Sequence, residues 1–355
     1  MKLSVTAKRS SQQTPNPSNK RTAHRQHMAK YRHALPQIRG DFFLTDGGIE
    51  TTLIFLEGQD LPHFAAFHLF RTPEGEGTLR KYFRAYAELA QKFRSGLLLE
   101  TATWRASTDW GEKLGYTSDA LAEANKKSVR LLEEIRDEYE IPRTPIVISG
   151  CVGPRGDGYV PSNTMSDKQA EDYHSLQVET FAGTAADLVT AITMNYAEEA
   201  VGLARAARNA TLPVVISFTV ETDGKLPTGQ SLGDAIQQVD DATAGYPAYF
   251  MINCAHPSHF SSVVGGDEPW LERIRGLRAN ASTMSHAELN EAPELDAGNP
   301  GELGRDYAAL KRQQLKSLNV FGGCCGTDHR HVEQIALACL PLFRGELDER
   351  ARDHT

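Results

Sequence analysis

The sequence predicts one α/β domain, a parallel (β/α)₈ barrel of the TIM type. Eight short apolar runs alternate with helical segments along the 355-residue chain, which is the pattern of parallel strands joined by helices. Aspartate, glutamate or cysteine residues stand at or just after the ends of several of these runs, where such a barrel places its chemistry. A doubly wound open sheet is the alternative fold, but it would not bring the loops after the sixth and eighth runs together so naturally.

Each predicted strand is a short apolar run of the kind that turn residues separate. The eight strands are expected at 42–45, 97–100, 146–149, 188–192, 214–218, 249–253, 274–279 and 319–321. Helices are expected around 79–93 and 120–139, from about 167 before the fourth strand, and at 332–343, where the last helix closes the ring. The seventh run is the weakest of the eight.

The two ends of the chain differ from this body. Residues 1–40 hold nine Lys or Arg and no acid, and their polar composition without apolar periodicity predicts a disordered basic tail. The barrel is expected at 41–345, with a charged C-terminal tail at 346–355. A mitochondrial targeting segment has a similar basic composition; the alternatives are an unstructured extension or a natural start at Met28.

Charge and hydropathy exclude several classes of partner. The net charge is −8, but outside the basic tail the chain has 29 basic against 46 acidic residues, a net charge of −17. Such a body is a poor match for nucleic acid, whose phosphates bind basic surfaces. No run has the length of a membrane helix, and no secretory signal is evident. We therefore expect a soluble, cytoplasmic protein that binds small molecules, and we leave open whether it forms a homo-oligomer.

The cysteines carry the strongest chemical signal. The last strand opens into Gly-Gly-Cys-Cys-Gly at 322–326, and the sixth ends in Asn-Cys at 253–254. Three thiolates at two strand ends make an open zinc site, because zinc is usually tetrahedral and a three-ligand shell leaves one position for substrate or water. The alternatives are packing cysteines, a vicinal disulfide, or a closed structural site in which a nearby histidine is the fourth ligand. Cys151 and Cys339 are interpreted as packing residues, and the set as a whole fits a reducing compartment.

Two loops carry less information. Residues 150–159 contain four glycines after the third strand, which allow the backbone to approach a ligand, but they lack the Gly-Lys-Ser/Thr ending of a phosphate-binding loop. The segment 285–306 is acidic, and we expect a solvated connector after the seventh strand.

On these motifs the chain resembles the zinc-dependent homocysteine S-methyltransferases, from about residue 42 to about residue 340. The resemblance implies that Cys254, Cys324 and Cys325 bind zinc (Zn²⁺) and that the acceptor thiol takes the fourth place. It also implies that Asp46 helps to hold the ammonium group of homocysteine and that Glu100 helps to shape the pocket floor. The full set of implied substrate-binding residues is Asp46, Gly47, Glu100, Thr101, Ile192 and Thr193.

One position departs from that family. Many members have Glu-Thr at the end of the fourth strand, and this chain has Ile192 followed by Thr193. Loss of the carboxylate removes a charge-assisted hydrogen bond, worth about 1.5 to 3 kcal/mol. Either Asp46 carries the ammonium alone, or the acceptor is a different thiol.

The sequence thus predicts a zinc-dependent S-methyltransferase. Its leading acceptor is homocysteine, giving methionine, and its leading donors are S-methylmethionine and S-adenosylmethionine, with betaine as a weaker candidate. The zinc would generate the thiolate nucleophile, and the barrel mouth would orient it. The alternatives are a methyltransferase or demethylase that acts on another sulfur compound, and a non-catalytic zinc or thiol sensor.

Overall fold

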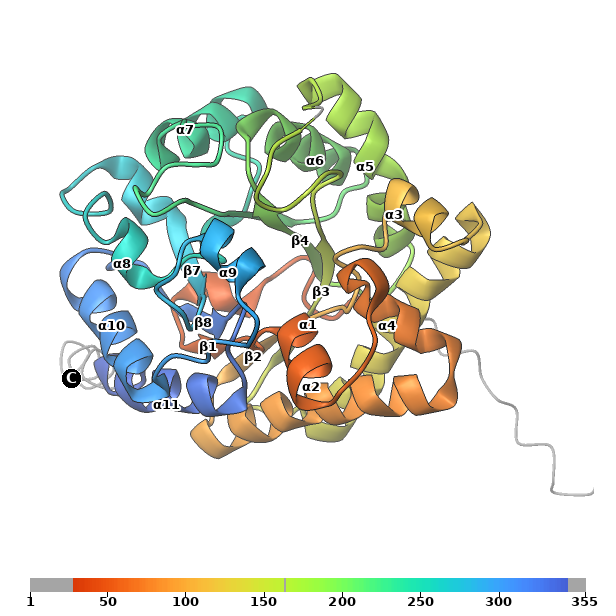
Figure 1. The fold of residues 1–355 in the computed structure, drawn as a ribbon, viewed down its shortest axis with the longest axis horizontal. Coiled ribbons are helices and arrows are strands. Elements are labelled where there is room, and N and C mark those ends of the chain that lie inside the picture. Colours follow the sequence, from red (N-terminus) through yellow and green to blue (C-terminus); the bar gives the residue numbers. More distant parts are fainter. Residues whose placement is uncertain (1–27, 163, 344–355) are drawn as a thin grey trace, which may run out of the picture.

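The chain folds into a closed ring of eight parallel strands surrounded by helices, which confirms the predicted (β/α)₈ barrel. The structure is a computed structural model, and it describes residues 28–162 and 164–343. The strands are hydrogen-bonded in chain order, and the eighth pairs with the first to close the ring. Figure 1 looks down this ring, with the strands at the centre and the helices outside.

The strands are short and almost entirely buried, as expected for parallel strands covered on both faces. They are β1 (Phe43–Leu44), β2 (Gly96–Glu100), β3 (Ile146–Val152), β4 (Leu188–Met194), β5 (Val214–Phe218), β6 (Tyr249–Asn253), β7 (Ile274–Ala279) and β8 (Val320–Gly323). All eight lie at the predicted runs. β3 continues past its predicted end because its ladder with β4 extends through Cys151↔Thr190 and Val152↔Ala191. β4 continues past its predicted end because Met194 pairs with Phe218 of β5.

In the described part of the chain, seven long helices form the outer ring. They are α2 (Pro73–Phe93), α4 (Ser118–Tyr139), α5 (Asp167–Ala182), α6 (Ala197–Asn209), α7 (Leu232–Thr243), α10 (Pro300–Gln313) and α11 (His329–Cys339). Ser or Thr side chains cap several of them, such as Ser166 on α5. Shorter helices lie in the connections: α1 (Ile49–Thr51), α3 (Thr108–Lys113), α8 (Pro257–Phe260) and α9 (His286–Glu291). Within the described residues, no helix combines the length and the apolar character that a membrane span requires.

The core has two layers because side chains alternate between the faces of each strand. Leu98, Val147 and Val215 belong to the cluster inside the ring, whereas their neighbours Leu99 and Ile148 belong to the cluster between the strands and the helices. The inner cluster is small and fills the amino-terminal part of the ring. The carboxyl ends of the strands are therefore left for the polar residues of a site.

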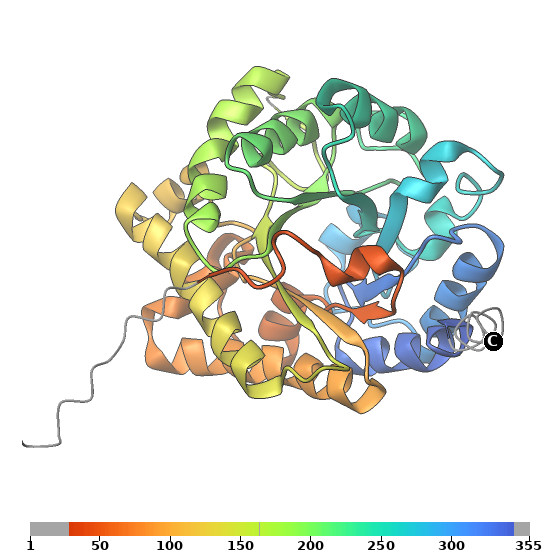
Figure 2. The same ribbon diagram turned by 180° about the vertical axis from the view of Figure 1, so that it is seen from behind.

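Residues 28–40 correct the predicted extent of the N-terminal tail. They run across the amino-terminal end of the ring (red in Figure 2), with Leu35 in the inner core cluster. The Arg32 guanidinium donates to the carbonyls of Ala182, Thr184 and Ala186 at the end of α5. The prediction of disorder was wrong for this part because it judged the segment by its polar composition, although the polar groups find partners on the barrel. Residues 1–27, with the targeting hypothesis, and the C-terminal tail at 346–355 lie outside the described residues.

Candidate metal centre and substrate cavity

Three cysteines meet at the carboxyl end of the barrel. Cys254 directly follows β6, and Cys324 and Cys325 directly follow β8. Their sulfur atoms all lie within 4.8 Å of one another, and the Sγ atoms of Cys254 and Cys325 are 3.9 Å apart. All three thiols are free, so the vicinal disulfide considered from the sequence is not formed. The two strand ends therefore place three potential thiolate ligands in one cluster.

The glycines of the Gly-Gly-Cys-Cys-Gly motif allow the end of β8 to pack against its neighbours. A Cβ atom on Gly322 would lie 1.8 Å from Oγ1 of Thr45, and one on Gly323 would lie 2.1 Å from Oγ1 of Thr327. Neither position has room for a side chain. The close packing fixes the backbone from which the next two residues, both cysteines, project.

Asn253 holds the backbone around the third cysteine. Cys254 has φ 55° and Thr193, at the end of β4, has φ 65°, a region that residues other than glycine seldom occupy. The Asn253 Oδ1 atom accepts hydrogen bonds from the Thr193 amide (3.0 Å) and from the Ser217 hydroxyl (2.6 Å). The Asn253 amide group also donates to Thr193 Oγ1 at 2.9 Å. The Asn-Cys motif thus joins three strand ends next to the thiol cluster.

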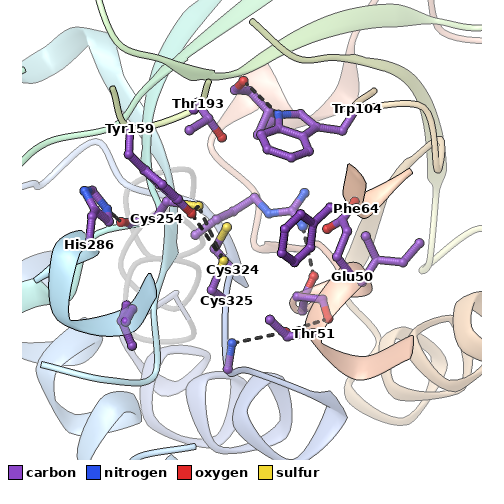
Figure 3. Close-up of a pocket in the computed structure, with 18 of the residues that line it drawn as sticks. Glu50, Thr51, Phe64, Trp104, Tyr159, Thr193, Cys254, His286, Cys324 and Cys325 are labelled. Atoms are coloured by element: carbon purple, nitrogen blue, oxygen red, sulfur yellow. Dashed lines mark hydrogen bonds between the residues drawn. The ribbon is translucent and has the colours of Figure 1, made fainter. Parts of the chain in front are cut away.

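Tyr159 and His286 stand beside the thiols, and the sequence did not identify either of them. The Tyr159 hydroxyl lies 3.5 Å from Sγ of both Cys254 and Cys325. Its ring stacks on the His286 imidazole at 4.0 Å, and Nε2 of that imidazole contacts the Cys254 carbonyl at 2.5 Å (Figure 3). Burial, with the charge of the nearby thiolates, raises the pKa of Tyr159 well above its ordinary value, so the hydroxyl stays protonated. It is therefore a hydrogen-bond donor toward the sulfurs.

The thiols also influence one another. Hydrogen bonds from Cys324 and Cys325 lower the pKa of Cys254 well below its ordinary value.

A buried arginine occupies the centre of the barrel mouth. The Arg278 side chain, from β7, is 8% exposed, and its Nη2 lies 2.7 Å from Oδ1 of Asp46. Its Nη1 donates to the Glu100 carboxylate, and its Nε and Nη2 donate to the carbonyls of Gly323 and Gly47 at 3.1 Å each. One guanidinium thus bridges the ends of β1, β2 and β8.

The two carboxylates depend on this guanidinium. Burial raises the pKa of Asp46 and of Glu100, and the charge of Arg278 opposes the rise. Burial alone would lower the pKa of Arg278, but the same two carboxylates raise it well above its ordinary value. The second oxygen of Asp46 accepts from the Tyr82 hydroxyl at 3.0 Å. Both oxygens of Asp46 are therefore engaged by the protein itself.

A cavity of about 350 Å³ opens above these groups. All nine of the site residues expected from the sequence line it: Asp46, Gly47, Glu100, Thr101, Ile192, Thr193, Cys254, Cys324 and Cys325. Aromatic side chains form much of the remaining wall, among them Phe55, Phe64, Trp104 and Tyr159. Figure 3 shows Tyr159 and His286 on one side of the cysteines and Phe64 with Glu50 on the other. The geometry therefore combines thiols, charged groups and aromatic rings in one space.

Two interpretations change once the loops are seen in place. The segment 285–306 is more than a solvated connector, because α9 lies over the ring in Figure 1 and Leu289 and Leu295 line the cavity. The histidines considered as a fourth ligand, His256, His259, His329 and His331, are not part of the thiol cluster. Within the described residues, the group that could hold a metal contains the three cysteines alone. His259, for example, contacts the Thr283 carbonyl. Cys339 is a buried core residue, and Cys151 is buried at the cavity wall.

One sulfur pair of the thiol cluster has the spacing expected in a zinc site. Tetrahedral Zn–S bonds of about 2.3 Å place the sulfurs roughly 3.8 Å apart, and the Cys254–Cys325 separation is 3.9 Å. Among the described residues, no histidine or carboxylate belongs to this group of possible ligands, so a zinc ion held by the three cysteines would keep one coordination position open. The donor set therefore fits zinc with an open position.

Comparison with known proteins gives a consistent picture. The sequence model described as homocysteine S-methyltransferase matches residues 43–339. Homocysteine S-methyltransferase 2 of Arabidopsis thaliana is 22% identical over 323 residues, which cover 83% of this chain and 92% of that protein. Betaine–homocysteine S-methyltransferase 1 of Rattus norvegicus is 24% identical over 89% of this chain and 76% of its own length.

Solved structures show the same barrel. The homocysteine methyltransferase MmuM of Escherichia coli, in its oxidised form, superposes with a TM-score of 0.65 at 20% identity and covers 87% of this chain and 99% of its own. Its metallated form superposes with a TM-score of 0.62 at 21% identity, over 84% and 96% of the two chains. The likeness to these structures concerns the fold.

Proposed function

Because this chain belongs to the homocysteine S-methyltransferase family, we propose that it transfers a methyl group from an onium donor to homocysteine with the help of zinc. It is a methyltransferase. The observation that carries the zinc-dependent reaction is the cluster of three thiols within 4.8 Å of one another, open to a cavity of substrate size.

Cys254, Cys324 and Cys325 are the proposed zinc ligands. When bound by these cysteines, zinc would supply the Lewis acidity that keeps an acceptor thiol deprotonated at neutral pH. Tyr159, which stays protonated, donates toward two of the sulfurs and holds them in place. Its stacking partner His286 fixes the orientation of the phenol ring.

The proposed reaction is a direct displacement. The acceptor sulfur attacks the methyl carbon of the donor, and a new S–CH₃ bond forms while the bond from that carbon to the donor heteroatom breaks. The electron pair of the broken bond stays on the donor, which becomes neutral at that atom, and the thiol proton leaves to solvent. The cavity contributes by holding the two substrates in line.

The shape and lining of the cavity bear on the donor. Aromatic rings such as Trp104 and Phe64 attract cationic methyl groups, which suits a sulfonium or quaternary ammonium compound. A volume of about 350 Å³ lies near the lower end of the range for ligand cavities. We therefore place S-methylmethionine before the larger S-adenosylmethionine, and betaine after both.

Two residues favour a second candidate, methylation of a thiol that lacks an amino group. Ile192 supplies an apolar wall where many relatives have a carboxylate, and Asp46 is already paired with Arg278. A simple alkyl thiol would need neither acid.

Turnover assays on the purified, zinc-loaded protein test the proposal. The panel consists of homocysteine and a simple alkyl thiol as acceptors, each with the three donors, and the methylated product is measured by mass spectrometry. We expect methionine from homocysteine and S-methylmethionine. Methylation of the alkyl thiol alone would favour the second candidate, and methylation of neither thiol would refute the proposal.

A further inference from the structure

An amino-acid acceptor brings an ammonium group into a cavity whose acidic groups differ in burial and in their contacts with other charged groups. Six carboxylates line that cavity: Asp46, Glu50, Glu100, Asp157, Glu294 and Asp296. An ammonium group that leaves water needs an anionic partner that is not already committed to another cation. The contacts of each carboxylate therefore decide which one can receive it.

The two most deeply buried carboxylates are both paired with Arg278, although the Glu100 Oε1 atom has no hydrogen-bond partner among the described residues. Asp46 and Glu100 share the Arg278 guanidinium, and Asp46 also accepts from Tyr82. An ammonium group placed against them would lie next to the charge of Arg278. These two residues are therefore poor first partners for a second cation.

The three carboxylates at the rim are exposed. Asp157 accepts from the amides of Tyr159 and Val160, and Asp296 accepts from the amide of Gly298. Glu294 lies on the same exposed segment. An ion pair with an exposed carboxylate contributes little because water competes with it.

Glu50 differs from the other five. It lies on α1, four residues after Asp46, and it is half-buried in the cavity wall, opposite Tyr159 in Figure 3. Among the described residues no side chain forms a hydrogen bond or an ion pair with its carboxylate. Burial raises the pKa of Glu50 to about 7. A hydrogen bond from its own backbone amide and the charge of Arg278 oppose the rise, whereas the charges of Asp46 and Cys254 add to it. A carboxylate held in this way gains from a cation that arrives with the substrate.

We propose that Glu50 determines acceptor specificity by binding the ammonium group of homocysteine, in place of the carboxylate that is absent at Ile192. The inference rests on the proposed function, since it names the group that would recognise the acceptor of that reaction. The carboxylate that binds the ammonium group would then lie on α1 instead of at the end of β4, in another part of the lining of the same cavity. The free end of the acceptor would then point toward α1 while its thiol reaches the cysteines.

The decisive experiment compares two acceptors in the wild type and in Glu50→Gln. The acceptors are homocysteine and 4-mercaptobutyrate, which is homocysteine without its amino group. We expect the kcat/KM for homocysteine to fall about 10- to 100-fold in the variant, the effect of one lost charge-assisted hydrogen bond. With 4-mercaptobutyrate as acceptor, the kcat/KM should change less than about twofold, and so should the KM for the donor, within the range of neutral surface changes.

Other patterns would overturn the inference. An equal loss for both acceptors would assign Glu50 a structural role, and a rise in donor KM alone would show that Glu50 holds the cation of the donor. The matched control is Glu294→Gln, which removes an exposed carboxylate from the lining of the same cavity and should leave the kcat/KM of both acceptors unchanged. Glu50→Asp keeps the charge and, if the glutamine variant does not fold, provides the same comparison with a smaller loss.

Calorimetric binding of homocysteine separates this inference from the proposed function. Binding that weakens in Glu50→Gln supports the role of Glu50 even if the wild type transfers no methyl group. Methyl transfer with binding that is equal in both proteins would uphold the function and refute the role of Glu50.

Discussion

Removal of the buried guanidinium by Arg278→Met should destabilise the fold strongly at neutral pH. The variant leaves Asp46 and Glu100 buried without their cation, and the loss of one partner of a buried ion pair typically costs about 3 to 5 kcal/mol. The two carboxyls can limit the cost by taking up protons. Protonation at pH 7 of a group with a pKa near 4 costs about 4 kcal/mol, so the loss should lie between about 4 and 8 kcal/mol.

The pH dependence of this loss has a definite sign. Burial already raises the pKa of both carboxyls in the folded protein, and loss of Arg278 removes the charge that opposes the rise. The folded variant then keeps protons that the unfolded chain releases above about pH 4, so its stability falls as the pH rises. Between pH 7 and pH 5 the loss should shrink by about 2.7 kcal/mol for each carboxyl that is protonated.

Urea unfolding of the wild type and the variant, at both pH values and with the same zinc content, measures these differences. Arg275→Met is the control, because Arg275 lies on the same strand and its side chain, among the described residues, donates only to the exposed Ile38 carbonyl. It should cost less than about 1 kcal/mol at either pH. Arg278→Lys should be more stable than Arg278→Met, because lysine keeps the positive charge but lacks the planar guanidinium that pairs with two carboxylates at once. A loss below about 1 kcal/mol in Arg278→Met, or a loss equal at both pH values, would refute the reasoning.

Three further predictions follow from the site and from the N-terminal segment. Alanine at any one of the three proposed ligands should abolish both zinc binding, measured by metal analysis, and turnover, while far-ultraviolet circular dichroism shows an intact barrel. A chain that starts at Met28 should unfold at the same urea concentration as the full chain, whereas Arg32→Ala should lose about 1 to 3 kcal/mol because it leaves carbonyls at the end of α5 without their donor. The preference for homocysteine over 4-mercaptobutyrate should fall as the pH drops through about 7, because Glu50 takes up a proton there. The charged groups around Glu50 are Asp46, Cys254, Arg278 and Arg105. A pH-independent ratio of the two kcat/KM values would contradict this prediction.

The fold could be predicted from the sequence because each of its eight strands has a local signal. Apolar runs such as 97–100 and 214–218 are short and lie between helical segments, and a parallel ring is the arrangement that buries them all. The predicted extent of the N-terminal tail was wrong because residues 28–40 have no such local signal. Arg32 and Leu35 are ordered by contacts with the far end of α5 and with the inner core, and no local pattern reports such contacts.

The site was predictable only where a motif marks it. The cysteines and Asp46 stand in recognisable turns at strand ends, and the structure brings them into one cavity. Arg278 lies inside a weak strand and could be taken for an outward-facing residue. Tyr159 reaches the thiols from a glycine-rich loop whose path cannot be predicted from local sequence. The raised pKa of Glu50 depends on its burial in the folded protein, which the sequence does not show.

The charges around the thiols explain why an acid on α1 suits this barrel better than one at Ile192. Three thiolates with one zinc ion carry a net charge of −1, and the cluster of Asp46, Glu100 and Arg278 carries another −1. Ile192 is 7% exposed, so a carboxylate there would add a buried charge next to both. Glu50 is half-buried, and with a pKa of about 7 it can shed its charge when no cation is bound.

Ile192→Glu therefore has different effects in two backgrounds. In the wild type it adds an acid that Glu50 already makes redundant, and turnover should fall for both homocysteine and 4-mercaptobutyrate. In Glu50→Gln the new carboxylate is the one free partner offered to the ammonium group, so homocysteine should recover much of its lost kcat/KM while 4-mercaptobutyrate does not. A double-mutant cycle on the homocysteine kcat/KM measures this coupling, which for neighbouring groups is typically about 0.5 to 3 kcal/mol. Strictly additive effects would mean that the two positions do not serve the same ammonium group.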